Sequence, residues 1–131
     1  MSTSRVSVAS IALWVGVVGL CAAQQPTFKR TELQRGDLSA GPREAVQAAV
    51  DFQAGATSGR HTHPGEELGY ILEGSLRFEM DGQPAVVKKA GDYFMVPMGT
   101  VHSATNVGPG NAKVLATYIV EKGKPIATPV P

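Results

Sequence analysis

Glycine and proline interrupt this chain so often that little room is left for long helices. The 131 residues include 15 Gly and 9 Pro, and both residue types are unfavourable inside helices. Turn signals recur at intervals of roughly 8–12 residues, a spacing typical of short strands joined by tight turns. The length suits one domain. The frequency of glycine, proline and turn signals therefore predicts an all-β, antiparallel sandwich or barrel.

The alternation of apolar and polar side chains supports this prediction. Residues 46, 48, 50 and 52 are apolar and alternate with residues 47, 49 and 51, as in a half-buried strand. The Glu, Ala and Gln of the same segment also allow a helix, and the sequence leaves this alternative open. Further strands are predicted at 68–72, 75–80, 86–90, 93–96, 101–106 and 114–120. Asp81-Gly82 marks a hairpin turn.

The first 23 residues have the pattern of a secretory signal peptide. Arg5 precedes an uncharged run from Val6 to Ala23, which ends in the small residues that favour cleavage before Gln24. An uncleaved membrane anchor or a lipid-modified Cys21 are the alternatives, although Leu20 is large for a lipoprotein signal. We expect a secreted or periplasmic protein with no stable membrane association after cleavage. The mature chain of 108 residues would then have no cysteine and no disulfide.

The charge balance excludes one class of partner. Lys and Arg number 12 and Asp and Glu number 11, and loss of Arg5 with the signal would make them equal. Because nucleic-acid binding depends on a basic surface that neutralises phosphates, no nucleic-acid partner is expected. A small molecule is the expected partner.

The three histidines of the chain suggest a metal site. His61 and His63 are two residues apart, which on a strand places both side chains on one face. Glu67 follows Pro64-Gly65-Glu66, which we interpret as a turn, and His102 lies on a later predicted strand. Three imidazoles and one carboxylate suit a divalent transition metal.

The residues around these four positions resemble the two sequence motifs of the cupin superfamily. Gly55 is followed by five residues, His61-Thr62-His63, three residues, Glu67, six residues and Gly74. Gly91 is followed by five residues, Pro97-Met98-Gly99, two residues, His102, three residues and Asn106. The segment between the motifs, 75–90, has the length found in small bacterial cupins. Among these, the chain is most similar to the quercetin-dioxygenase-like, single-domain group.

The resemblance implies a jelly-roll β-barrel at 43–121, with an N-terminal arm at 24–42 and an extended, proline-rich tail at 122–131. It implies one metal ion, Zn, Cu, Fe, Mn or Ni, held by His61, His63, Glu67 and His102. Small cupins are often homodimers, so a homodimer is expected. We expect Asn106 to close a turn and Glu66 to be solvated or to support the ligands.

For function, the resemblance favours a metal-dependent oxidoreductase of the dioxygenase type that acts on a small organic substrate. In that reaction Glu67 would also be catalytic, as the base that accepts the substrate proton. A non-catalytic metal- or ligand-binding protein and a non-redox isomerase or lyase are the alternatives, and the sequence does not separate them.

Two apolar features have no assigned place. Tyr70 and the methionines at 80, 95 and 98 could line a pocket, although core packing is the interpretation we favour. Segment 68–72 has large apolar residues on both faces, so a second layer should cover it: the other sheet, the tail or a second subunit.

Overall fold

The computed structural model describes residues 24–131, which form strands and connecting loops without a helix. The predicted signal peptide lies outside the described residues. The strands are β1 (Phe28–Asp37), β2 (Arg43–Phe52), β3 (His61–Thr62), β4 (Gly65–Glu73), β5 (Ser75–Met80), β6 (Val86–Lys89), β7 (Tyr93–Val96), β8 (His102–Asn106), β9 (Ala112–Glu121) and β10 (Thr128–Pro129). In this part of the chain, no helix able to span a membrane occurs.

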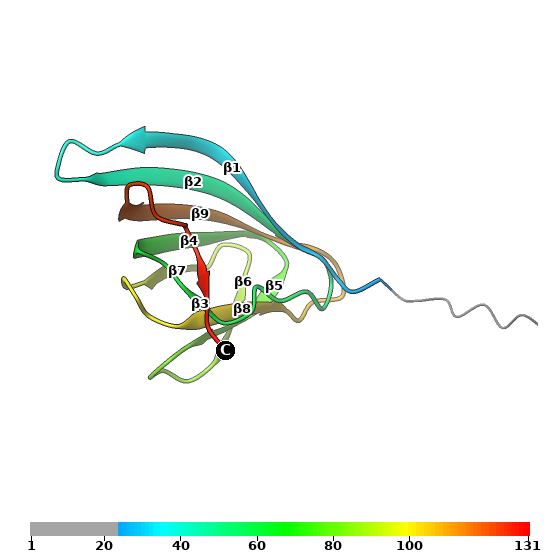
Figure 1. Cartoon of the computed structure of the whole chain (residues 1–131). Helices are drawn as coiled ribbons and strands as arrows, with labels where there is room; N and C mark the ends of the chain where they lie inside the picture. The colour runs from blue at the N-terminus through cyan, green and yellow to red at the C-terminus, as the bar shows by residue number, and fades with distance from the viewer. Residues whose placement is uncertain (1–23) are drawn as a thin grey trace, which may run out of the picture.

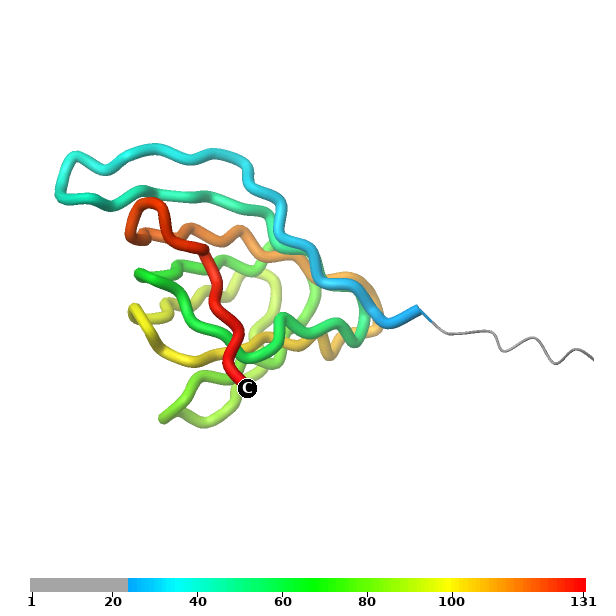
Figure 2. The backbone as a smooth tube through the Cα atoms, in the orientation of Figure 1, coloured from blue at the N-terminus to red at the C-terminus, as the bar shows by residue number. Residues whose placement is uncertain are grey.

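The strands form two antiparallel sheets that face each other (Figure 1). One sheet has the order β1-β2-β9-β4-β7 and the other β10-β3-β8-β5-β6. Consecutive strands repeatedly cross between sheets, which is a jelly-roll arrangement and confirms the predicted fold class. The path of the chain is traced in Figure 2.

The core lies between the sheets because the long strands alternate strictly. In β2, every second residue from Glu44 to Phe52 is buried, and in β9 every second residue from Ala112 to Val120 is buried. The two strands pair along their whole length. The helical alternative for residues 46–52 is therefore wrong, because the partner strand buries one face with period two.

Strand β1 has no clear signal in the sequence. It occupies ten residues of the predicted N-terminal arm and pairs with β2 at the edge of its sheet. Only Phe28 and Arg30 are partly buried, and the rest of the strand is exposed. Because so few of its residues face the core, the apolar alternation by which strands are recognised is missing.

The predicted turn at Pro64-Gly65-Glu66 is wrong. Gly65 and Glu66 already belong to β4, and the chain changes sheets at Pro64. Glycine is needed at 65 because a Cβ there would lie 1.9 Å from the backbone oxygen of Ile119. The close approach of β4 and β9 thus depends on a residue without a side chain.

The outer face of β4 and β7 is apolar and open. Leu68, Tyr70 and Leu72 are 43–48% exposed, and Tyr93 and Met95 of the neighbouring strand are exposed beside them. We call these five residues the outer apolar face. Neither the other sheet nor the tail covers it. Of the three covering layers predicted from the sequence, the second subunit remains.

The tail is anchored to a sheet near its end. Strand β10 pairs with β3, and the amide of Val130 donates a hydrogen bond to the carbonyl of Arg60. The tail therefore becomes the edge of the sheet that holds the histidines.

Candidate metal centre

Three histidines converge between the sheets. His61 of β3 and His102 of β8 are direct register partners, and His63 follows β3 by one residue. All three are at least 93% buried, and one ring nitrogen from each lies within 4.8 Å of the others. Their ring centroids are 4.3–4.9 Å apart. The structure thus brings together the three histidines that the sequence separates by up to forty-one positions.

Each histidine is oriented by a backbone carbonyl. The Nδ1 atoms of His61, His63 and His102 lie 2.8, 2.5 and 3.0 Å from the carbonyl oxygens of Gly59, Ile126 and Thr100, respectively. A carbonyl oxygen only accepts, so each Nδ1 must carry the proton. The Nε2 atoms are then the nitrogens with a lone pair for a metal, and the carbonyls hold the rings in place.

Glu67 reaches this cluster from the opposite sheet. Its Oε2 lies 3.0 Å from Nε2 of His63 and 3.0 Å from Nε2 of His102. A neutral imidazole whose proton is on Nδ1 has no proton on Nε2 to donate to Glu67. The lone pairs of Glu67 Oε2 and of the two Nε2 atoms therefore face one another unless an extra proton or a cation lies between them. This donor set fits a metal ion.

The electrostatics of the site follow from its burial. Burial raises the pKa of Glu67, but the contacts of its Oε2 with Nε2 of His102 and His63 outweigh this and hold the pKa at about 2, as a proton or another positive charge between these atoms would. Burial lowers the pKa of His61 to about 4. At neutral pH His61 is thus uncharged and Glu67 is ionised, the forms that bind metals.

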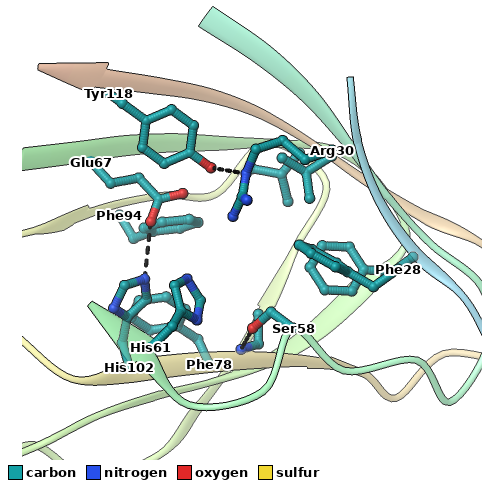
Figure 3. A pocket seen from close by; sticks show the side chains of 13 residues that line it. Phe28, Arg30, Ser58, His61, Glu67, Phe78, Phe94, His102 and Tyr118 are labelled. Atoms are coloured by element: carbon teal, nitrogen blue, oxygen red, sulfur yellow. Dashed lines mark hydrogen bonds and ion pairs between the residues drawn. The ribbon is translucent and has the colours of Figure 1, made fainter. Parts of the chain in front are cut away.

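A cavity of about 30 Å³ adjoins the cluster. His61, Glu67 and His102 lie at one end, with Phe78 and Phe94 beside them (Figure 3). The other walls are Phe28, Arg30, Val50, Phe52, Ser58, Ala104, Val114 and Tyr118. This volume is far below that of a typical ligand pocket, so the cavity as it stands admits only a very small ligand.

Arg30 and Tyr118 are site residues that the sequence did not reveal. Arg30 belongs to the polar arm, where no motif marks it. Tyr118 is fully buried in β9, and its hydroxyl accepts a hydrogen bond of 3.0 Å from Nε of Arg30. Burial and the charge of Glu67 raise the pKa of Tyr118 above its usual value. Alternation predicts that Tyr118 faces inward, but not that it reaches the site.

Other predicted residues have different positions. Tyr70, Met95 and Met98 are about half exposed, so the favoured core placement is wrong for them, whereas Met80 packs against the core. None of these three lines the cavity beside the histidines. They lie on the surface because their strand positions, or the turn at Met98, face away from the core.

Asn106 and Glu66 lie outside the cluster. The amide of Asn106 donates to the carbonyls of Phe52 and Gly110 and accepts from the amide of Gly108. Asn106 therefore closes a turn, as predicted. Glu66 points away from the histidines and forms an ion pair with Arg43.

Comparisons with known proteins agree with this geometry. The model of the cupin domain matches residues 48–118. Oxalate oxidase 2 of Hordeum vulgare is 31% identical over 77 residues, which are 53% of this chain and 34% of that protein. The chain thus spans about a third of the length of this relative.

Solved structures extend the comparison to the fold. The DMSP lyase DddQ of Ruegeria pomeroyi has a TM-score of 0.60 at 26% identity, over 66% of this chain and 43% of that one. A double-stranded β-helix protein of Klebsiella pneumoniae has a TM-score of 0.62 at 18% identity, over 82% and 86% of the two chains. At that identity, the second likeness shows the fold alone.

Proposed function

This chain belongs to the cupin domain family, and we propose that it is an exported protein that binds one divalent transition metal and oxidises a small organic substrate. The proposed ligands are His61, His63, Glu67 and His102. One observation carries the proposal: three buried imidazoles, each with Nδ1 beside a backbone carbonyl, bring one ring nitrogen each within 4.8 Å of the others, next to a buried carboxylate.

The activity is proposed from the site and from a relative. A metal ion would supply Lewis acidity there and, if redox-active, a path for electrons. The histidines and Glu67 would hold it, while Phe78 and Phe94 exclude water on one side. The likeness to oxalate oxidase 2 of Hordeum vulgare favours an oxidoreductase.

The proposed role of Glu67 as a base is weaker than its role as a ligand. A carboxylate with a pKa of about 2 is a poor proton acceptor near neutral pH. To act as the base, Glu67 would have to move away from the histidines that lower its pKa.

A non-redox lyase is the second candidate. The likeness to DMSP lyase DddQ supports it. The two candidates differ in their need for oxygen, because an oxidase or dioxygenase reaction stops without O2 and a lyase reaction continues.

The experiment loads the purified protein with Fe, Mn, Ni or Cu in turn and offers a panel of small phenols, enols and carboxylic acids. Oxygen uptake with one substrate, abolished in His61→Ala, would support the oxidoreductase. Product formation under argon would support the lyase instead. Absence of oxygen uptake with every metal would refute the oxidoreductase.

We further propose that the protein taken from its native compartment contains Zn or Cu. If export is unfolded, the site assembles outside the cytosol, where the affinity order favours Cu and Zn over Mn and Fe. Elemental analysis of the exported protein tests this, and one equivalent of Mn or Fe would contradict it.

We also propose that the protein is a homodimer joined through the outer apolar face. Large exposed apolar patches mark interaction surfaces in soluble proteins, and this face combines two aromatic and three aliphatic side chains on adjacent strands. Sedimentation of the wild type against Leu68→Lys tests it. A wild-type monomer at micromolar concentration would overturn the proposal.

A further inference from the structure

Arg30 extends from the edge strand β1 into the cavity of the proposed metal centre. Its Nε donates to the Tyr118 hydroxyl at 3.0 Å, and its guanidinium carbon lies 5.4 Å from the ring centroids of both Phe28 and Tyr118. Figure 3 shows the remaining guanidinium nitrogens directed toward the cavity between Tyr118 and the histidines. Two aromatic contacts and one hydrogen bond therefore hold this cation at a defined place.

The charge of Arg30 has no carboxylate partner in the described part of the chain. Each of the other four arginines between residues 24 and 131 does have one: Arg35 pairs with Glu32 and Glu44, Arg43 with Glu66, Arg60 with Asp81, and Arg77 with Glu79. Within residues 24–131, the bond from Nε to Tyr118 is the hydrogen bond that the Arg30 side chain makes. The two outer nitrogens of the guanidinium are thus available to a ligand.

The nearby acid does not neutralise Arg30. Glu67 lines the same cavity, but its Oε2 is engaged with His63 and His102. With a divalent cation bound, the charges of the metal, Glu67 and Arg30 sum to about +2, because the histidines are neutral ligands. The walls around these charges are mostly phenylalanine, valine and alanine. Apolar walls strengthen the attraction of the cavity for an anion.

We propose that Arg30 is a specificity-determining residue that binds the carboxylate of a small anionic ligand. The two parallel N–H groups of a guanidinium match the two oxygens of a carboxylate, and a cavity of about 30 Å³ restricts the ligand to a very small one. The inference deepens the proposed function by naming its substrate class. It depends on a strand outside the matched cupin region, residues 48–118.

The test compares binding of malonate with binding of malonamide, its neutral analogue of similar shape. Calorimetry would measure both affinities for the whole protein, first without metal and then with Zn. Wild type should prefer malonate at least tenfold in both states. Arg30→Met should reduce this preference at least tenfold and leave zinc content unchanged, because Arg30 is not a proposed ligand. Arg30→Gln provides a second neutral variant if the first does not fold.

Arg77→Met is the matched control, since Arg77 is an exposed arginine on β5 that pairs with Glu79. It should bind malonate as wild type does. Equal binding of malonate by wild type and Arg30→Met, or equal binding of the acid and the amide by wild type, would overturn the inference. Failure of the proposed function looks different: the preference for malonate would persist in a protein that binds no metal.

Discussion

Replacing Glu67 with Gln directly tests whether the contacts between Glu67 and the histidines require a proton or a metal ion. Gln keeps the shape of the side chain, removes the negative charge and adds an N–H donor. In metal-free protein that N–H can be donated to Nε2 of His63 or His102, which both lie 3.0 Å from Oε2 of Glu67. We therefore expect metal-free Glu67→Gln to remain folded, whereas its metal affinity falls.

The size of the effect follows from the loss of the proposed anionic ligand. Groups that merely support a ligand change metal affinity by about 10- to 100-fold, so loss of a direct ligand should cost at least about 100-fold. At a fixed metal concentration well above the dissociation constant, that factor removes about 2.7 kcal/mol of metal-induced stabilisation. For a domain of this size it corresponds to roughly 10–20 °C in the metal-induced rise of Tm.

The assay is thermal unfolding with EDTA and with excess zinc. Glu66→Gln is the matched control, because Glu66 is the preceding residue, points away from the cluster and forms a partly exposed ion pair with Arg43. Such pairs contribute about 1 kcal/mol or less, so the metal-induced rise should be unchanged. An unaltered rise in Glu67→Gln, or severe destabilisation of its metal-free form, would refute the reasoning.

Three further predictions follow from the same geometry. His61→Ala should lose the metal, as measured by elemental analysis, and one full equivalent in that variant would mean that the ligand assignment is wrong. Gly65→Ala should lower the free energy of unfolding, measured in urea, by about 3 kcal/mol, because its Cβ would lie 1.9 Å from a backbone oxygen of β9. Gly36→Ala is the control and should change this free energy little, because open space surrounds Gly36. Similar urea unfolding curves for the two variants would contradict the clash. A chain shortened after residue 125 loses the Ile126 carbonyl that orients His63. Its zinc affinity, measured by competition with a chelator, should fall about 10- to 100-fold. A zinc affinity equal to that of the full chain would show that the Ile126 carbonyl does not support the site.

The sequence predicted those strands and site residues whose placement follows from a local pattern. Alternation predicted β2 and β5 because each buries one face. The spacing of the histidines predicted the cluster because strands place alternate residues on one side. Where side chains face solvent along most of a strand, as in β1, alternation carried no information.

The rest of the site depends on contacts that local patterns do not encode. Arg30 and Tyr118 are 88 positions apart, and His63 and Ile126 are 63 positions apart. Tyr70 and Met95 are as apolar as core residues, yet they lie outside because pairing register, rather than hydrophobicity, sets the face of a strand.

The carbonyl of Ile126 also sets a sequence of events for biosynthesis. His63 obtains the acceptor for its Nδ1 only after sixty-three further residues have been made. During the proposed unfolded export, all four proposed ligands can thus emerge while one of them is still unoriented. Maturation of the centre would therefore be among the last steps of folding. An affinity tag that disturbs residues 126–130 would lower the metal content of the protein rather than cause it to misfold.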